Sequence, residues 1–188
     1  MQAFDFDNTI YKGESAFDFA LFAFKKNKRF ILYTFPLIRL LIKYKRCKMT
    51  PDEFTDELNK YIYIIVGNKA LIEDLVVEFW SIYDKNLYLN MLEKIHFNDV
   101  IVTTCPNFIM KGIQKRLRTK NILCTDVDLK RGKINYLNFG DNKVRLFKKK
   151  YPNRIIKNFY TDSYNDKPFM EFSKNVYLVN HGDCTKIK

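Results

Sequence analysis

The chain has 188 residues, of which 47% are hydrophobic, and its formal net charge at pH 7 is +12. This length suits one domain, or one domain with an inserted subdomain, and the apolar content excludes a globally disordered chain. The positive charge favours anionic partners such as phosphates, nucleic acid or a lipid surface, although a solvated lysine-rich surface explains it equally well.

Residues 2–7 predict a first strand, and the apolar spacing after them predicts a series of helices. The expected helices cover residues 15–26, 30–45, 51–64, 69–83 and 86–96. Thr50 is an expected N-cap, because Pro51 follows it at the first helical position and acidic residues occupy the first turn.

After this helical block, short apolar runs alternate with basic helices. The expected strands cover residues 98–106, 122–127, 155–162 and 175–180, the last of which closes the chain. The expected helices between them cover residues 108–118 and 142–150, with one more from about residue 166. A glycine-centred turn within residues 130–140 indicates a hairpin.

This alternation predicts an α/β fold, with a Rossmann-like, mainly parallel sheet flanked by helices. The helical block interrupts the pattern between the first and second strands. We therefore expect residues 13–90 to form an all-helical cap subdomain, and residues 1–12 and 91–188 to form the core domain.

Four cysteines are scattered without a Cys-x-x-Cys pair, and only two histidines are present. This pattern argues against a zinc site or a disulfide framework and predicts a cytoplasmic protein. The longest apolar stretch, residues 29–45, is interrupted by Pro36 and Arg39, so we expect it to be too short and too charged to span a bilayer.

Polar side chains end several of the predicted strands. Asp5 and Asp7 are two residues apart, so on a strand they would share a face and raise each other's pKa. Thr103, Thr104 and Asp162 end later strands. Because ligands bind at the carboxyl ends of parallel strands, we expect these groups to meet in one site that holds a cation or moves a proton.

Four segments in chain order resemble the motifs of the haloacid dehalogenase superfamily of phosphohydrolases. DFDNT (Asp5–Thr9) is similar to its first motif, D-x-D-x-T, and Thr103 after VIV is similar to the second. Lys143 in GDNKVRLF is similar to the third, and DSYND, with Asp162 and Asp166, to the fourth, D-S-x-x-D. The resemblance spans nearly the whole chain, and four ordered motifs are far more specific than one.

The resemblance implies a Mg²⁺-dependent phosphomonoester hydrolase. Asp5 would be the nucleophile that forms an aspartyl-phosphate, and Asp7 the general acid and base. Asp5, Asp162 and the backbone carbonyl of Asp7 would hold Mg²⁺, which offsets the charge between carboxylates and phosphate. Asp166 would complete the metal site by orienting a metal-bound water, or would instead orient Lys143.

The remaining motif residues would bind the phosphoryl group. The Thr103 hydroxyl and the Thr104 N–H would donate to phosphoryl oxygens, and Lys143 would supply positive charge. Taken singly, Thr103 could be a plain strand-end hydroxyl, and Asp162 a turn residue. The acid at Asp7 favours phosphatase chemistry, because dehalogenases of this superfamily lack an acid there.

A helical insertion directly after the first motif resembles the phosphoserine-phosphatase-like branch, which suggests a small phosphorylated metabolite as substrate. Glu14 lies where that branch often has an acidic substrate-binding residue. It could equally be an acid favoured by the helix dipole.

Residues 25–48 contain nine Lys or Arg and no acid, interleaved with apolar residues. This composition suits an anionic membrane surface, and the segment faintly resembles the insert of phosphatidylglycerophosphate phosphatases, so a membrane lipid phosphate is an alternative substrate. We favour a cap helix pair with a basic rim. A basic nucleic-acid-binding module is the other alternative, which no RNA-binding signature supports.

Overall fold

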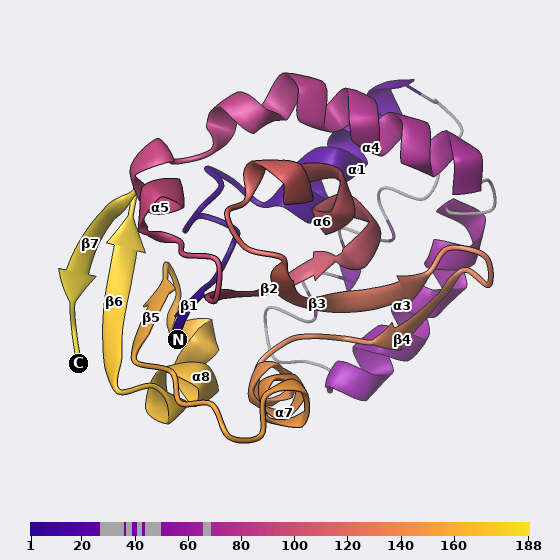
Figure 1. Cartoon of the computed structure of the whole chain (residues 1–188). Helices are drawn as coiled ribbons and strands as arrows, with labels where there is room; N and C mark the ends of the chain where they lie inside the picture. The colour runs from indigo at the N-terminus through magenta and orange to yellow at the C-terminus, as the bar shows by residue number, and fades with distance from the viewer. Residues whose placement is uncertain (27–35, 37–38, 41–42, 44–49, 66–68) are drawn as a thin grey trace.

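The computed structural model describes residues 1–26, 36, 39–40, 43, 50–65 and 69–188. Among these residues, seven strands form one sheet in the order β4-β3-β2-β1-β5-β6-β7 (Figure 1). The strands are β1 (Gln2–Phe4), β2 (Val100–Pro106), β3 (Asn121–Asp128), β4 (Lys133–Tyr136), β5 (Asn158–Thr161), β6 (Asn175–Asn180) and β7 (Asp183–Lys186).

The five strands in the middle of the sheet run parallel, and each edge strand runs antiparallel to its neighbour. The predicted α/β fold with a mainly parallel sheet is confirmed, as is the hairpin, which pairs β4 with β3. The prediction that residues 175–180 form the last strand is wrong, because β7 follows. Gly182, at a φ of 88°, allows the sharp turn back that forms this second hairpin.

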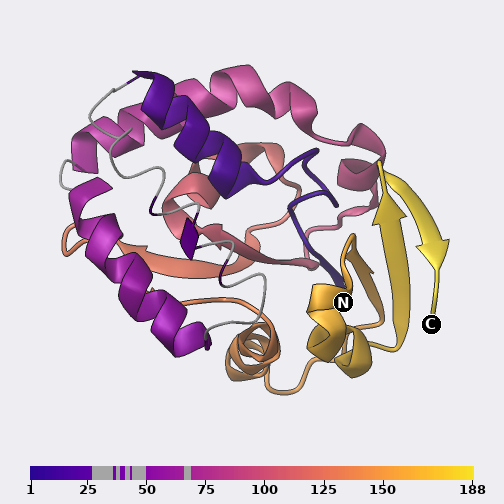
Figure 2. The same ribbon diagram turned by 180° about the vertical axis from the view of Figure 1, so that it is seen from behind.

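The two faces of the sheet carry separate hydrophobic clusters, because successive strand residues point to opposite faces. Phe4 and Ile101 belong to one cluster, and Ala3 and Val100 to the other. Figures 1 and 2 show the two helical layers. The first cluster contains side chains of α1 (Ser15–Lys26), α4 (Lys69–Tyr83), α5 (Leu89–Lys94) and α6 (Asn107–Ile113). The second contains side chains of α7 (Asp141–Lys150) and α8 (Lys167–Phe172).

The helices predicted over 15–26 and 69–83 are confirmed as α1 and α4, and that over 51–64 as α3 (Pro51–Ile65). Thr50 caps α3 as expected, because its Oγ1 accepts from the Glu53 N–H at 3.2 Å. Two predicted helices are shorter, with 3-10 turns beside them: α5 follows η2 (Asp84–Asn86), and α6 leads into η3 (Gln114–Arg116). The helix predicted from about residue 166 is α8, which begins at Lys167 after η4 (Tyr164–Asp166). The helix predicted over 30–45 lies almost entirely outside the described residues.

Helices α4 and α6 are in close contact. The Trp80 Nε1 donates a hydrogen bond to the Ile109 carbonyl at 2.8 Å, and a Cβ added to Gly112 would lie only 2.4 Å from Cγ1 of Val76. Thus α1 and α4 share a core with β1 and α6. The division into a core and a cap of residues 13–90 stays a prediction.

None of the helices in the described parts of the chain has the length and the apolar character that a membrane crossing requires.

Candidate active site

The loop after β1 carries both carboxylates of the first motif. The strand ends at Phe4, so the strand predicted over residues 2–7 is too long, and Asp5 and Asp7 lie beyond its end. The physical reason is a tight turn, in which the Phe6 carbonyl accepts hydrogen bonds from three nearby backbone N–H groups at 2.8 to 3.3 Å. The turn begins after Asp5, whose N–H still donates to the Tyr160 carbonyl of β5 at 2.8 Å, and it places Asp7.

Lys143 connects the first, third and fourth motifs through one buried group of ion pairs. Its Nζ lies 3.0 Å from Oδ1 of Asp5 and 2.6 Å from Oδ1 of Asp166. The other carboxylate oxygen of Asp166 accepts a hydrogen bond from Thr161 Oγ1 at 3.0 Å. The three charged residues are each no more than 7% exposed. These contacts of Asp166 match one of its two expected roles, the orientation of Lys143, whereas a metal role stays a prediction.

The site contains more carboxylate groups than cations. Burial raises the pKa of Asp5 well above its ordinary value, although Lys143 offsets part of the rise, and burial raises the pKa of Asp7 to about 7 and that of Asp162 to about 6. Burial alone would lower the pKa of Lys143, but the charges of Asp5 and Asp166 outweigh it and raise that pKa. Within the described residues, neither Asp7 nor Asp162 forms an ion pair.

The start of α1 holds Asp7 in place. The N–H of Ser15, the first residue of α1, donates to Oδ1 of Asp7 at 2.8 Å. Next to it, the Asn8 side chain donates to Oε1 of Glu14 at 3.4 Å. Glu14 contacts Asn8 of the first motif and directly precedes Ser15, so it lies beside Asp7, and its charge contributes to the raised pKa of both Asp7 and Asp162. Contact between Glu14 and a substrate stays a prediction.

Thr103 and Thr104 lie at the carboxyl end of β2, beside the loop that carries Asp5. The register of β1 against β2 places Thr103 one residue beyond the level of Asp5. The Thr103 hydroxyl is buried and accepts from the Cys105 N–H at 3.0 Å. The Thr104 hydroxyl donates to the Asn138 carbonyl at 3.1 Å. Both residues are thus near the candidate nucleophile, and their contact with a phosphoryl group stays a prediction.

The residues expected to hold Mg²⁺ offer only oxygen atoms, namely the carboxylates of Asp5 and Asp162 and the backbone carbonyl of Asp7. Mg²⁺ prefers such ligands and commonly keeps several waters, so it is often bound by one or two carboxylates. Among the described residues, no three His, Cys, Asp or Glu side chains are grouped so as to hold a metal. The expected set needs only two side chains, and the excess of negative charge fits a divalent cation.

Several buried polar residues that support the site were not predicted from the sequence. Thr161 fixes Asp166, and Thr125 and Asn138 hold the carbonyls of Thr104 and Thr103. The signal for Thr161 was present, because it is a hydroxyl at the end of a buried strand, directly before a motif acid. Asn138 stands in a polar loop sequence, where nothing distinguishes it from other loop residues.

Three solved structures have a similar fold. A protein of unknown function from Bordetella pertussis Tohama I has a TM-score of 0.77 and 17% identity, covering 94% of this chain and 87% of that one. A phosphoserine phosphohydrolase-like protein from Francisella tularensis has a TM-score of 0.59 and 18% identity, over 94% and 86%. A HAD family hydrolase from Salmonella enterica serovar Typhi has a TM-score of 0.55 and 15% identity, over 91% and 58%. At these identities the likeness concerns the fold.

No curated protein matches the sequence. The sequence model of the family HAD, haloacid dehalogenase-like hydrolase, matches residues 3–171. This range contains all four motifs and both carboxylates that contact Lys143. The expected family is therefore confirmed, and the chain belongs to the haloacid dehalogenase-like hydrolases.

Proposed function

We propose that the protein is a Mg²⁺-dependent phosphomonoester hydrolase of the phosphoserine-phosphatase-like branch, which acts through an aspartyl-phosphate on Asp5. The observation that carries the proposal is the buried Lys143 held between Asp5 and Asp166, with Asp7 as a second carboxyl nearby. A cation beside the nucleophile attracts a phosphate dianion, and a second carboxyl supplies the proton that an alkoxide leaving group needs.

Hydrolysis would take place in two displacements. In the first, a carboxylate oxygen of Asp5 bonds to phosphorus, the ester P–O bond breaks, and Asp7 gives its proton to the departing alkoxide. In the second, Asp7 takes a proton from a water whose oxygen attacks phosphorus, the bond between phosphorus and Asp5 breaks, and inorganic phosphate leaves. The hydrogen bond from Ser15 keeps Asp7 in one orientation for both proton transfers.

Other residues would bind and neutralise the transferring group. Mg²⁺, held by Asp5, Asp162 and the Asp7 carbonyl, would offset negative charge when bound. Lys143 would stay charged and stabilise the pentacoordinate phosphorus, together with the Thr103 hydroxyl and the Thr104 N–H. The carboxylate of Asp166 would keep Lys143 in position.

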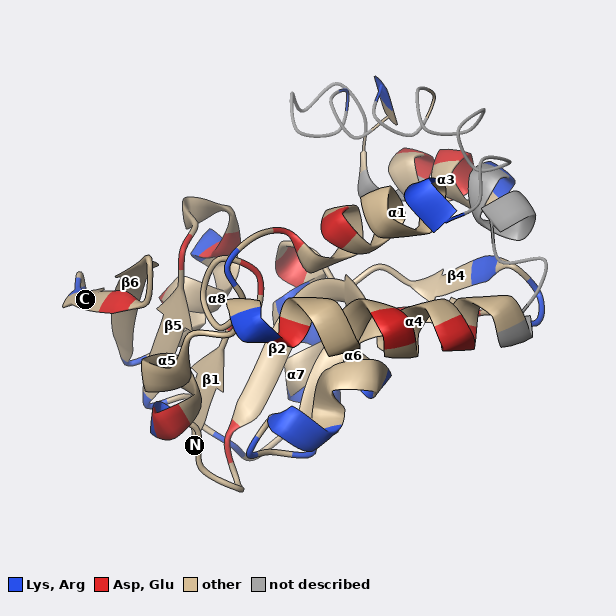
Figure 3. Ribbon diagram, turned by 90° about the horizontal axis from the view of Figure 1, so that it is seen from above, with Lys and Arg blue, Asp and Glu red and all other residues tan. Residues whose placement is uncertain are grey.

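We propose a small phosphorylated metabolite as substrate, with Glu14 near the leaving group. The position of Glu14 supports this, because it contacts Asn8 of the first motif and directly precedes Ser15, whose N–H binds Asp7. The lipid-phosphate alternative depends on residues 25–48, most of which lie outside the described residues, and it stays a prediction. Among the described residues in Figure 3, Lys and Arg are spread over several helices and loops. This distribution does not favour the nucleic-acid alternative, which would need the basic residues gathered on one surface.

The metal dependence gives a direct test of the proposed function. We expect the purified protein to hydrolyse p-nitrophenyl phosphate with Mg²⁺, to lose this activity in EDTA and to regain it with excess Mg²⁺. Asp162→Asn should raise the Mg²⁺ concentration needed for half-maximal activity at least about tenfold, and should weaken the rise in melting temperature that Mg²⁺ gives the wild type. Asp183→Asn, on the exposed edge strand β7, serves as the control. Activity that EDTA leaves intact would contradict the metal role.

A further inference from the structure

The hydrogen-bond ladder between β2 and β3 is interrupted next to the candidate site. Val102 pairs with Leu123, and the next pair is Pro106 with Thr125. Three residues of β2 therefore lie opposite a single residue of β3, as in a bulge. The register of the two strands shifts across this stretch, which includes the second motif.

Two buried side chains donate hydrogen bonds to backbone carbonyls at this interruption. Asn138 Nδ2 donates to the carbonyls of Thr103 and Leu123, each at 2.9 Å. Thr125 Oγ1 donates to the Thr104 carbonyl at 2.6 Å and accepts from the Asn138 N–H at 3.1 Å. Thr104 Oγ1 completes the network by donating to the Asn138 carbonyl. We call Thr125 and Asn138 the carboxyl-end clamp, and neither is more than 3% exposed.

The carboxyl-end clamp also belongs to the segment that presents Lys143. Asn138 stands shortly before α7, and the intervening turn is closed by hydrogen bonds from Asn142 Nδ2 to the Leu137 carbonyl at 2.9 Å and from the Lys143 N–H to the Gly140 carbonyl at 3.1 Å. Asn138, which binds the Thr103 carbonyl, is thus linked to the start of α7, whose Lys143 contacts Asp5.

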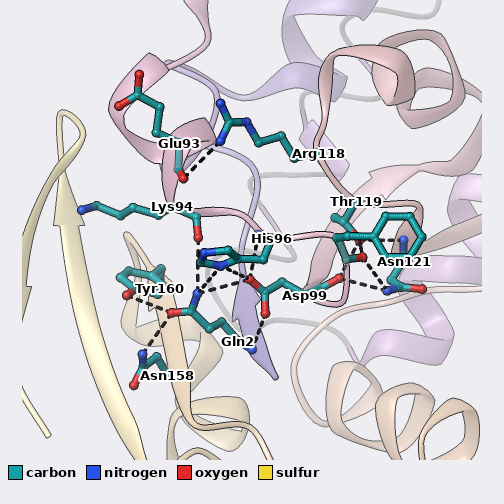
Figure 4. A network of polar contacts seen from close by, with 11 residues as sticks. Gln2, Glu93, Lys94, His96, Asp99, Arg118, Thr119, Asn121, Asn158 and Tyr160 are labelled. Atoms are coloured by element: carbon teal, nitrogen blue, oxygen red, sulfur yellow. Dashed lines mark hydrogen bonds and ion pairs between the residues drawn. The ribbon is translucent and has the colours of Figure 1, made fainter.

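A chemically matched pair lies at the opposite end of the same two strands (Figure 4). There, Thr119 Oγ1 donates to the Asp99 carbonyl at 2.6 Å and accepts from the Asn121 N–H at 3.0 Å. Asn121 Nδ2 donates to the carbonyls of Asp99 and Phe97 at 3.1 and 3.4 Å. We call Thr119 and Asn121 the amino-end clamp. It borders none of the four motifs. A substitution there therefore shows how much such a pair contributes to stability, without an effect on the candidate site.

We propose that Thr125 and Asn138 are positioning residues for phosphoryl transfer, which hold the Thr103–Thr104 peptide in register with Lys143. The inference rests on the proposed function. The carboxyl-end clamp touches no reacting atom. It acts through Thr103, Thr104 and Lys143, because displacing a group that binds the reacting phosphoryl by about 1 Å can lower the rate about 100-fold.

The test compares Thr125→Val with Thr119→Val, because both replace a buried hydroxyl by a methyl group. Thr125→Val removes the hydrogen bonds to the Thr104 carbonyl and from the Asn138 N–H. Thr119→Val removes those to the Asp99 and Phe97 carbonyls and from the Asn121 N–H. Both variants should lose stability in denaturant. For hydrolysis of p-nitrophenyl phosphate with Mg²⁺, corrected for the folded fraction, Thr125→Val should lower kcat about 10- to 100-fold, with KM within about threefold, whereas Thr119→Val should keep kcat within about twofold. Thr125→Ser, which retains the hydroxyl, should restore kcat.

Further variants make the outcome decisive. If Thr125→Val does not fold, Thr104→Val removes the half-buried partner of the Asn138 carbonyl, and the same loss of kcat is expected. In the Thr103→Val background, Thr125→Val should have a smaller effect, because it acts through that segment. Equal kcat in the two Thr→Val variants, with an active wild type, would overturn this inference and leave the proposed function standing. A wild type without phosphatase activity would overturn both.

Discussion

Replacing Asp5 with asparagine should abolish turnover of p-nitrophenyl phosphate, with kcat falling at least about 1,000-fold while the protein stays folded. An amide oxygen carries no charge and is a weak nucleophile, so no covalent intermediate forms. The fold should survive because the two side chains have the same shape. Burial already disfavours the charge of Asp5, which offsets part of the lost contact with Lys143.

The measurement pairs steady-state kinetics with a denaturant titration. We expect the free energy of unfolding of Asp5→Asn to lie within about 2 kcal/mol of the wild-type value. Asp183→Asn should match the wild type in both measurements, because Asp183 is exposed on β7. A folded Asp5→Asn protein with a normal kcat would remove the covalent step from the mechanism.

Lys143→Met should cause the largest loss of stability of any single change in the site, about 3–5 kcal/mol, because it leaves Asp5 and Asp166 buried without their cation. It should also lower kcat at least about 100-fold, since the positive charge beside the transferring group is lost. Denaturant midpoints and kinetics on the folded fraction measure the two effects separately.

The same helix provides the control for this variant. Lys149 lies on the exposed side of α7, so Lys149→Met should change the unfolding free energy by no more than about 0.5 kcal/mol. Adding Asp166→Asn to Lys143→Met should recover part of the lost stability but none of the activity, because it removes one of the two unpaired carboxylates. If Lys143→Met and Lys149→Met were equally stable, the buried ion pairs would not hold the site together.

The elements of this fold could be predicted where burial on both faces or helical spacing determined them. The apolar run of β2 and the periodicity of α1 and α4 predicted their type and position. The end of β1 could not be predicted, because the turn that closes on the Phe6 carbonyl depends on hydrogen bonds rather than on residue type. The edge strand β7 was missed because its sequence, DCTK, has little apolar character.

The candidate site could be predicted to the extent that its residues belong to motifs. The contacts of Lys143 with Asp5 and Asp166 agree with the expected motif set. Thr125 and Asn138 could not be found from the sequence, because their importance comes from a bulge in the pairing of β2 and β3. Such an interruption becomes visible only when the register of the two strands is known.

The covalent intermediate on Asp5 is the central claim, and rapid acid quenching of a single turnover followed by peptide mapping tests it most directly. Cleavage after Lys12 releases residues 1–12 as one peptide that contains both Asp5 and Asp7. We predict that this peptide gains the mass of one phosphoryl group, that fragmentation places the group on Asp5, and that Asp5→Asn lacks it. A phosphoryl group on another residue, or an active enzyme in which residues 1–12 are never modified, would contradict the account.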